Sequence, residues 1–145
     1  MSEVIVGVDG SPGSDLAVDW ATDLATALDS PLRIVHAYVP WSAQYPFSLS
    51  GADAGTQQLE GTQHAAGEGV LQDAARRARE RGGIEPVTEL VAADPAEALI
   101  ERSGQARLLV IGSRGLGSIK GLLLGSVSQR CVQLARCPVT VVPQS

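Results

Sequence analysis

Residues 111–126, IGSRGLGSIKGLLLGS, contain five glycines among sixteen residues and follow directly on a hydrophobic run. A tight turn needs one or two glycines, so five indicate that a large polar group approaches the main chain where side chains would block it. Phosphate is the group that successive bare N–H groups commonly bind in proteins. This segment therefore predicts a site in which main-chain amides hold an anion.

Charge is distributed unevenly along the chain. Residues 1–101 hold all 16 acidic residues and five arginines, a net charge of −11, whereas residues 102–145 hold six basic residues and no acid, a net charge of +6. The glycine-rich segment lies in this basic part, which suits a small anionic ligand, although such residues also commonly cover solvated helix faces. The total charge of −5 argues against nucleic acid as a partner.

Several other kinds of site lack their motifs. The chain has no GxxxxGK sequence, and no GxGxxG sequence stands between its first predicted strand and helix. Residues 9–15, DGSPGSD, resemble the ATP pyrophosphatase loop only faintly, because the paired glycines of that loop are missing. His36 lies inside an apolar run and is predicted to be a core histidine. We find no catalytic Ser/His/Asp set and no cluster with metal-ligand spacing.

The chain has the length and composition of one soluble domain. Its 145 residues are enough for a sizeable core, and 44% of them are hydrophobic. No apolar run approaches the ~20 residues that span a bilayer. The N-terminus lacks the basic stretch of a secretory signal, and Cys131 and Cys137 are predicted to be reduced thiols. These features predict a cytoplasmic protein without membrane contact.

Five short apolar runs predict strands, at 3–8, 32–39, 86–91, 107–112 and 138–142. Several of them are continuous rather than alternating, as in a parallel sheet covered on both faces. Helices are predicted from 11–12 to about 28, from between 56 and 68 to 83, from 94–95 to about 103, and from about 126 to 135. The segment 40–58, rich in Gly, Ser and Pro, predicts a long surface loop.

This alternation predicts a single doubly wound α/β domain over 1–145. It has helices on both faces of a five-stranded parallel sheet and a variable loop over 40–64. The expected strand order is 3-2-1-4-5. Ligands of such sheets bind beyond the carboxyl ends of the strands, where the order reverses. The reversal falls between the strands at 3–8 and 107–112, so Asp9 and the glycine-rich segment are predicted to meet at one crevice.

The spacing Gly112-2x-Gly115-9x-Gly125-Ser126 is similar to the G-2x-G-9x-G-S/T motif of the universal stress protein family. The surrounding stretches VIGSRG, LLLGSVSQ and CPVTVV resemble that family too, as does the opening IVGVDGSPGSDLAVDWA. The resemblance covers the chain apart from 40–64. It implies the same sheet order, and it implies ATP binding, since family members with this motif bind ATP.

The resemblance also implies nine nucleotide-binding residues, namely Val8, Asp9, Ala37, Ile111, Gly112, Gly115, Gly125, Ser126 and Val127. Asp9 would bond the ribose or adenine, and Ala37 stands where the family packs a larger apolar residue, commonly valine, against adenine. Residues 111–115 would line ribose and phosphate, and 125–127 would hold the outer phosphates. The physics agrees, because 125–127 open a predicted helix whose free N–H groups and dipole favour an anion.

We expect a stress-response or regulatory protein whose bound ATP, with or without Mg²⁺, acts as a signal, and not an enzyme. Hydrolysis needs an oriented water and charge stabilisation at the γ-phosphate. No convincing base is present, although Arg114 and Lys120 could supply charge. A slow ATPase, a cyclic-AMP binder and an interaction module without nucleotide remain alternatives. Trp41, which follows the second strand, is predicted to lie beside the adenine site and to report ligand binding.

The last strand predicts a homodimer. Residues 138–143, PVTVVP, are β-branched and uncharged, so an exposed edge here would invite pairing with another strand. Two copies could pair Val139, Thr140, Val141 and Val142 antiparallel about a two-fold axis, with the flanking prolines limiting further growth. The family resemblance points to the same dimer. The alternative is an edge covered by residues 144–145 or by a neighbouring helix.

Overall fold

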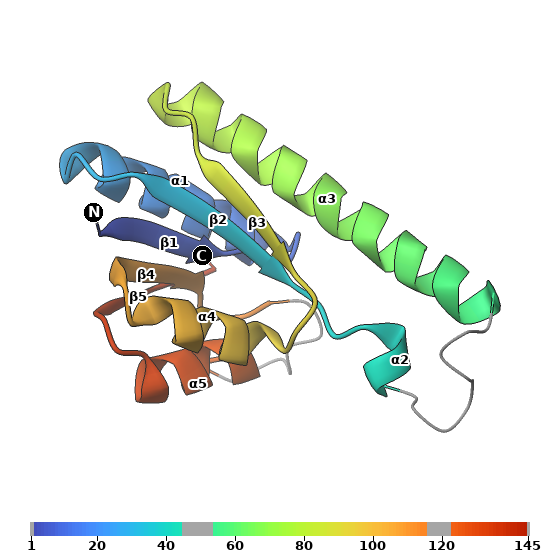
Figure 1. Cartoon of the computed structure of the whole chain (residues 1–145). Coiled ribbons are helices and arrows are strands. Elements are labelled where there is room, and N and C mark those ends of the chain that lie inside the picture. The colour runs from blue at the N-terminus through green and yellow to red at the C-terminus, as the bar shows by residue number, and fades with distance from the viewer. Residues whose placement is uncertain (1, 45–53, 116–122, 145) are drawn as a thin grey trace.

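In the computed structural model, which describes residues 2–44, 54–115 and 123–144, the chain forms a five-stranded parallel sheet (Figure 1). The strands are β1 (Glu3–Gly7), β2 (Leu32–Ala37), β3 (Val87–Val91), β4 (Ala106–Gly112) and β5 (Val139–Val142). Their order is β3-β2-β1-β4-β5, and all four neighbouring pairs are parallel. The predicted fold class and strand order are confirmed.

Helices cover both faces of the sheet, as predicted (Figure 1). Helices α1 (Pro12–Ala27) and α3 (Ala54–Gly82) lie against one face, and α4 (Pro95–Ser103) and α5 (Ser126–Leu134) lie against the other. The short α2 (Trp41–Gln44) packs against α3 beyond the end of β2. No helix in the described ranges is long and apolar enough to cross a membrane.

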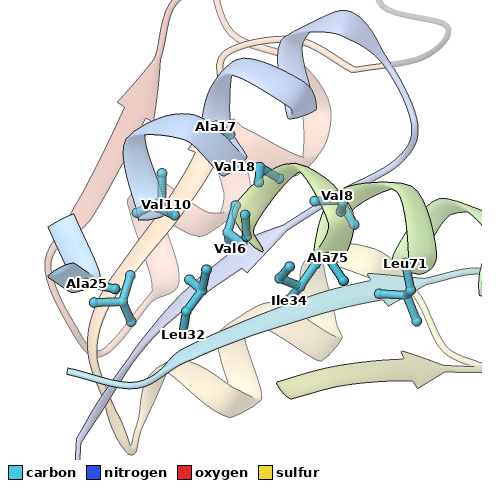
Figure 2. Packing of buried hydrophobic residues seen from close by; sticks show 14 of the residues in the cluster. Val6, Val8, Ala17, Val18, Ala25, Leu32, Ile34, Leu71, Ala75 and Val110 are labelled. Atoms are coloured by element: carbon cyan, nitrogen blue, oxygen red, sulfur yellow. The ribbon is translucent and has the colours of Figure 1, made fainter. Parts of the chain in front are cut away.

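Each face of the sheet has its own hydrophobic core. Between the sheet and the helices α1 and α3, Val6 and Ile34 pack with Val18, Leu71 and Ala75 (Figure 2). The opposite face buries Ile5, Val35, Leu99, Leu109, Ile111 and Cys131. Successive residues of a strand point to opposite faces, so the neighbours Ile5 and Val6 enter different cores. Burial on both faces explains why these strands are continuous apolar runs in the sequence.

Side-chain caps determine where α1 and α4 begin. The Ser14 amide donates to the Ser11 hydroxyl oxygen (3.2 Å), and the Glu97 amide donates to the Asp94 carboxylate (3.0 Å). A proline follows each cap near the first helical position, where a missing N–H leaves no helical bond unmade. Both helix starts agree with the sequence-based prediction.

The predicted loop over 40–64 is wrong where the structure describes it, because Trp41–Gln44 form α2 and α3 begins at Ala54. Gly61, Gly67 and Gly69 make the start of α3 difficult to predict from the sequence, because glycine is unfavourable within a helix. An added Cβ at Gly61 or Gly69 would meet nothing, whereas one at Gly67 would lie 2.6 Å from the Leu90 side chain. Gly67 therefore lets α3 cross closely over the sheet. Residues 45–53 of the predicted loop lie outside the described residues.

Gln63 of α3 holds the chain that leaves β2. Its Oε1 atom accepts the Trp41 N–H (2.9 Å), and its Nε2 atom donates to the Val39 carbonyl oxygen (3.0 Å). These bonds satisfy backbone groups of a segment that has no strand partner, so they stabilise α2 against the N-terminal part of α3.

Candidate functional site

A cavity of about 430 Å³ opens at the carboxyl ends of β1 and β4, where the strand order reverses. All nine residues predicted to bind nucleotide line it, namely Val8, Asp9, Ala37, Ile111, Gly112, Gly115, Gly125, Ser126 and Val127. Eight further residues line it as well: Gly7, Ser11, Ser14, Val35, Pro95, Leu99, Arg114 and Ser128. The structure thus brings the predicted residues together, and their roles toward a nucleotide stay a prediction.

One wall of the cavity is apolar. It consists of Val35 and Ala37 from β2, Pro95 and Leu99 from α4, and Ile111 from β4. Val35, Leu99 and Ile111 also belong to the core between the sheet and the helices α4 and α5, so tight packing holds this wall in place. A flat ring of low polarity would fit against such a wall.

Asp9, which follows β1 closely, begins the polar side of the cavity. Its Oδ1 atom accepts the Ser11 N–H (2.9 Å), and this bond leads the chain from the strand into α1. Gly10 between them has a φ of +84°, a left-handed conformation that glycine adopts readily. The carboxylate also lies against Gly115, where an added Cβ would overlap Oδ2. Asp9 therefore connects the turn after β1 with the turn after β4.

Gly112 and Gly115 have a packing role, which is the alternative to phosphate binding that the glycine-rich sequence left open. An added Cβ at Gly112 would lie 3.0 Å from the Gly13 carbonyl oxygen, and one at Gly13 would lie 2.7 Å from the Arg114 carbonyl oxygen. The first turn of α1 and the turn after β4 thus meet backbone to backbone. The sequence favours phosphate binding over packing as the reason for the two glycines, and in the structure they allow these turns to pack before any ligand is considered.

Helix α5 begins at the cavity without a side-chain cap, unlike α1 and α4. Its N-cap is Gly125, whose N–H donates to the Ser113 carbonyl oxygen (2.7 Å) and whose own carbonyl oxygen accepts the Gln129 N–H (2.9 Å). Ser126 and Val127 line the cavity, and N–H groups in the first turn of a helix lack partners within the helix. The start of α5 therefore offers the cavity amide donors and the positive end of a helix dipole.

Ser128 and Ser113 hold this helix start in place. The Ser128 hydroxyl, which is buried, lies within hydrogen-bond distance of the Ser113 and Gly125 carbonyl oxygens (2.8 and 3.0 Å). The Ser113 N–H in turn donates to the Val142 carbonyl oxygen of β5 (2.8 Å). The donors at the start of α5 are therefore fixed to the end of the sheet before any ligand binds, which lowers the cost of ordering them.

Arg114 is the basic residue among those that line the cavity, and no ion pair found among the described residues involves it. The basic excess of residues 102–145 is partly neutralised elsewhere, because Arg102 pairs with Glu89 and Arg130 pairs with Asp94 (2.7 and 3.0 Å). The basic excess of residues 102–145 is therefore not all available to the cavity. Within the described residues, the positive charge available to the cavity comes from Arg114 and the start of α5.

Trp41 and Lys120 are the two remaining residues with a predicted place at the site. Trp41 is not among the residues that line the cavity, so its predicted position beside the adenine site is not supported. Lys120 lies outside the described residues.

Within the described ranges, no group of three or more His, Cys, Asp or Glu side chains could hold a metal ion. Burial raises the pKa of the Cys131 thiol to about 11, which keeps it protonated near neutral pH.

A parallel sheet with a cavity at its switch point is the architecture of the doubly wound α/β domains. Within this class the chain belongs to the universal stress protein family, whose family model matches residues 1–143. Universal stress proteins of Mycobacterium tuberculosis and Mycobacterium bovis are 40% identical to it over 143 residues. The match covers 98% of this chain but 45% of those relatives, so the chain spans about half of their length.

Solved structures of the family share the fold. A universal stress protein in complex with cAMP is 32% identical, with a TM-score of 0.72 over 99% of this chain and 98% of that one. A family member from Burkholderia pseudomallei is 31% identical, with a TM-score of 0.70 over 98% and 96%. Universal stress protein UspA from Lactobacillus plantarum, at 18% identity and a TM-score of 0.83 over 97% of each chain, shows the likeness of the fold alone.

Proposed function

We propose that this chain binds ATP in the cavity and acts as a regulatory nucleotide-binding protein and not as an enzyme. The observation that carries the proposal is the uncapped start of α5. It lines one side of the cavity, and the apolar wall lines another. An open helix N-terminus favours phosphate, and an apolar wall favours a flat base. One nucleotide would satisfy both parts of the cavity.

The phosphates would lie along the turn after β4 and the start of α5. The amides of Ser126 and Val127 would donate to the outer phosphates, the Ser126 hydroxyl would add a donor, and Arg114 would add positive charge. Gly112 and Gly115 would leave the main chain open to the inner phosphates. Any Mg²⁺ would be bound mainly through phosphate oxygens, because the described residues offer no metal cluster.

The nucleoside would lie at the other end of the cavity. Asp9 would accept a hydrogen bond from a ribose hydroxyl or from the adenine amine, beside Val8. The base would pack on Ala37 and the apolar wall, and Ile111 would contact the ribose. Ala37 gives the base less apolar area than a valine would, so replacing Ala37 with valine is expected to strengthen adenine binding.

Cyclic AMP is the second candidate ligand. The universal stress protein in complex with cAMP is 32% identical to this chain and covers nearly all of it. A cyclic monophosphate carries less charge than a triphosphate and would engage fewer of the amides at the start of α5. We therefore expect ATP to bind more tightly, because it can reach both that helix start and Arg114.

The proposed output is occupancy of the site and not hydrolysis of the nucleotide. Cleavage of the γ-phosphate needs an oriented water and stabilisation of the developing charge. Among the residues that line the cavity, Asp9 supplies the carboxylate, and the proposed pose uses it at the nucleoside end. A slow ATPase is therefore the outcome that we do not expect, and phosphate release from bound ATP would reveal it.

Calorimetric titration with ATP, cAMP and adenosine, each with Mg²⁺, tests this proposal. We expect ATP to bind most tightly, and mass spectrometry of the denatured, freshly purified protein to detect ATP. If cAMP binds more tightly than ATP, cAMP and not ATP would be the proposed ligand of the cavity. An absence of binding by all three ligands at millimolar concentration would contradict nucleotide binding altogether and favour an interaction module.

We further propose that two copies of the chain pair through β5, which lies at one edge of the sheet. The Pro138 and Val142 carbonyl oxygens accept amides of the β4 side (3.0 and 2.8 Å). Alternate residues of a parallel strand face the same neighbour, so Thr140 also faces β4, while Val139 and Val141 present their N–H groups to the open edge. This edge has no charged side chain to oppose pairing.

A further inference from the structure

The imidazole of His36 lies where β1 and β2 separate at the cavity. The paired positions of the two strands end at Gly7 and Val35, and the Val8 N–H still donates to the Val35 carbonyl oxygen (2.9 Å). Beyond this point the Val8 carbonyl oxygen lies 2.7 Å from Nδ1 of His36. A side chain of β2 therefore satisfies the carbonyl oxygen of the residue that follows β1, before the chain turns to Asp9.

The direction of this bond is fixed by its chemistry. A carbonyl oxygen can only accept, so Nδ1 carries the proton and donates. Val8 is 7% exposed, which leaves its backbone little access to water. Without the imidazole donor, its carbonyl group would be left nearly buried and unsatisfied, a costly arrangement that movement of the turn would relieve.

The ring itself is held on the face of the sheet opposite to the cavity. Val35 and Ala37 line the cavity, and His36 between them points toward α3 because side chains alternate along a strand. There an added Cβ on Gly67 would lie 3.1 Å from Cδ2 of His36, so α3 covers the ring directly. The Tyr38 ring stacks beside it at a centroid distance of 6.5 Å. The packed ring can thus act as a rigid donor.

What the Val8 carbonyl supports is the turn that carries Asp9. This turn has its own bond from the Ser11 N–H to the Asp9 carboxylate (2.9 Å), and it passes through Gly10 at positive φ. Those contacts shape the turn, but they do not attach it to β2. The bonds at Val8 do so, one residue before the carboxylate: its N–H donates to the Val35 carbonyl oxygen, and its carbonyl oxygen accepts from the His36 imidazole.

We propose that His36 is a positioning residue for the candidate site. It contacts no ligand, and by anchoring the Val8 carbonyl it keeps the Asp9 carboxylate in place at the nucleoside end of the cavity. The effect on ligand affinity rests on the proposed nucleotide binding. The effect on the turn does not, because the hydrogen bond is present in the protein without any ligand.

Three substitutions separate this role from a general contribution to stability. In His36→Asn the side-chain amide nitrogen can occupy the position of Nδ1, so the donor is kept. In His36→Gln the nitrogen corresponds to Nε2 instead, and in His36→Leu no donor remains. His64→Leu is the matched control, since His64 is exposed on α3, where its Nε2 lies 3.7 Å from Glu68.

The first measurement is hydrogen exchange of the Ser11 amide, the donor to Asp9. We expect His36→Leu and His36→Gln to speed its exchange about tenfold, and His36→Asn and His64→Leu to leave it close to wild type. The second is calorimetry with ATP and with inorganic triphosphate. We expect His36→Leu to weaken ATP about tenfold but to change triphosphate affinity little, because the displaced carboxylate serves the nucleoside.

Equal exchange of the Ser11 amide in wild type and His36→Leu would overturn the proposal, and so would identical behaviour of the Asn and Gln variants. If His36→Leu does not fold, the Asn and Gln pair decides alone. If wild-type protein binds no ATP, the proposed function fails while the exchange measurement still decides the role of His36. If His36→Leu lost the same affinity for ATP as for triphosphate, the placement of Asp9 at the nucleoside end would be rejected.

Discussion

Arg114 and Arg76 differ in whether they line the candidate cavity, where an anionic ligand would bind. Arg114 lines the cavity, whereas Arg76 is exposed on α3 and pairs with Asp73 (2.9 Å). We expect Arg114→Gln to weaken ATP binding about tenfold, the scale of one charge-assisted contact. Because cAMP reaches fewer donors, its affinity should fall less.

Arg76→Gln is the matched control, because it removes the same charge from a residue that does not line the cavity. Calorimetry at two salt concentrations separates a local contact from a general effect of net charge, since general effects are screened by salt. If both variants weakened ATP equally, Arg114 would have no specific role at the phosphates.

The two motif glycines should respond differently to alanine. The added Cβ at Gly112 would meet the Gly13 backbone, which cannot move away easily, so Gly112→Ala should lower the free energy of unfolding by about 1–3 kcal/mol. At Gly115 the Cβ would meet the end of the Asp9 side chain, which can rotate away more easily than a backbone, so Gly115→Ala should cost less stability than Gly112→Ala yet weaken ATP binding. Urea unfolding and calorimetry on both variants provide the comparison. A larger stability loss for Gly115→Ala would contradict the packing of the two turns.

At the residue scale, the sequence predicted the part of the cavity that has a local signature. Gly112, Gly115, Gly125 and Ser126 could be found because their spacing is itself a motif, and Asp9 because it ends a predicted strand. Leu99 lines the cavity but has the pattern of a core residue, and only the packing of α4 beside β1 and β4 brings it there. Local sequence patterns do not encode that kind of neighbourhood.

Among the elements, β3 and α4 are joined by a carboxylate whose titration can be followed. Glu89 of β3 accepts two bonds from Arg102 of α4 (2.7 and 2.9 Å), and these bonds lower the pKa of Glu89 below its ordinary value of 4.5. A carboxyl group with a lowered pKa stabilises the folded state fully above its ordinary value, and this contribution is lost as the pH falls through the lowered pKa.

Glu89→Gln should therefore destabilise the protein near neutral pH, and the difference in free energy of unfolding from wild type should shrink as the pH falls below the ordinary Glu value of 4.5. Urea unfolding at several pH values measures the free energy of unfolding of wild type and variant. Glu80→Gln is the control, because Glu80 is exposed on α3. A difference that stayed constant with pH would show that Glu89 acts through packing and not through its charge.

The elements were predictable to the extent that their ends carry local signals. Ser11 and Asp94 with their following prolines marked the starts of α1 and α4 correctly. The N-terminal part of α3 was missed because its glycines and polar residues are typical of a loop. What stabilises it is contact with α2 through Gln63, and close crossing of the sheet at Gly67. Tertiary contacts of this kind override local helix propensity.

At the scale of the whole molecule, assembly depends on which N–H groups of β5 face outward. Val141→Pro removes a donor from the open edge and should yield a folded monomer, since the bonds to β4 are kept. Thr140→Pro removes a donor that faces β4 and should destabilise the domain itself. Analytical ultracentrifugation with thermal unfolding distinguishes the two outcomes. A wild-type protein that sediments as a monomer at tens of micromolar would contradict pairing through β5.

The central claim is that nucleotide phosphates lie at the start of α5, and the amide resonances of Ser126 and Val127 test it most directly. We predict that titration of isotope-labelled protein with ATP and Mg²⁺ shifts both resonances saturably, together with that of Ala37 at the nucleoside end. Titration with adenosine should shift Ala37 and leave the other two in place. Saturable ATP binding that leaves the Ser126 and Val127 resonances unmoved would contradict the account.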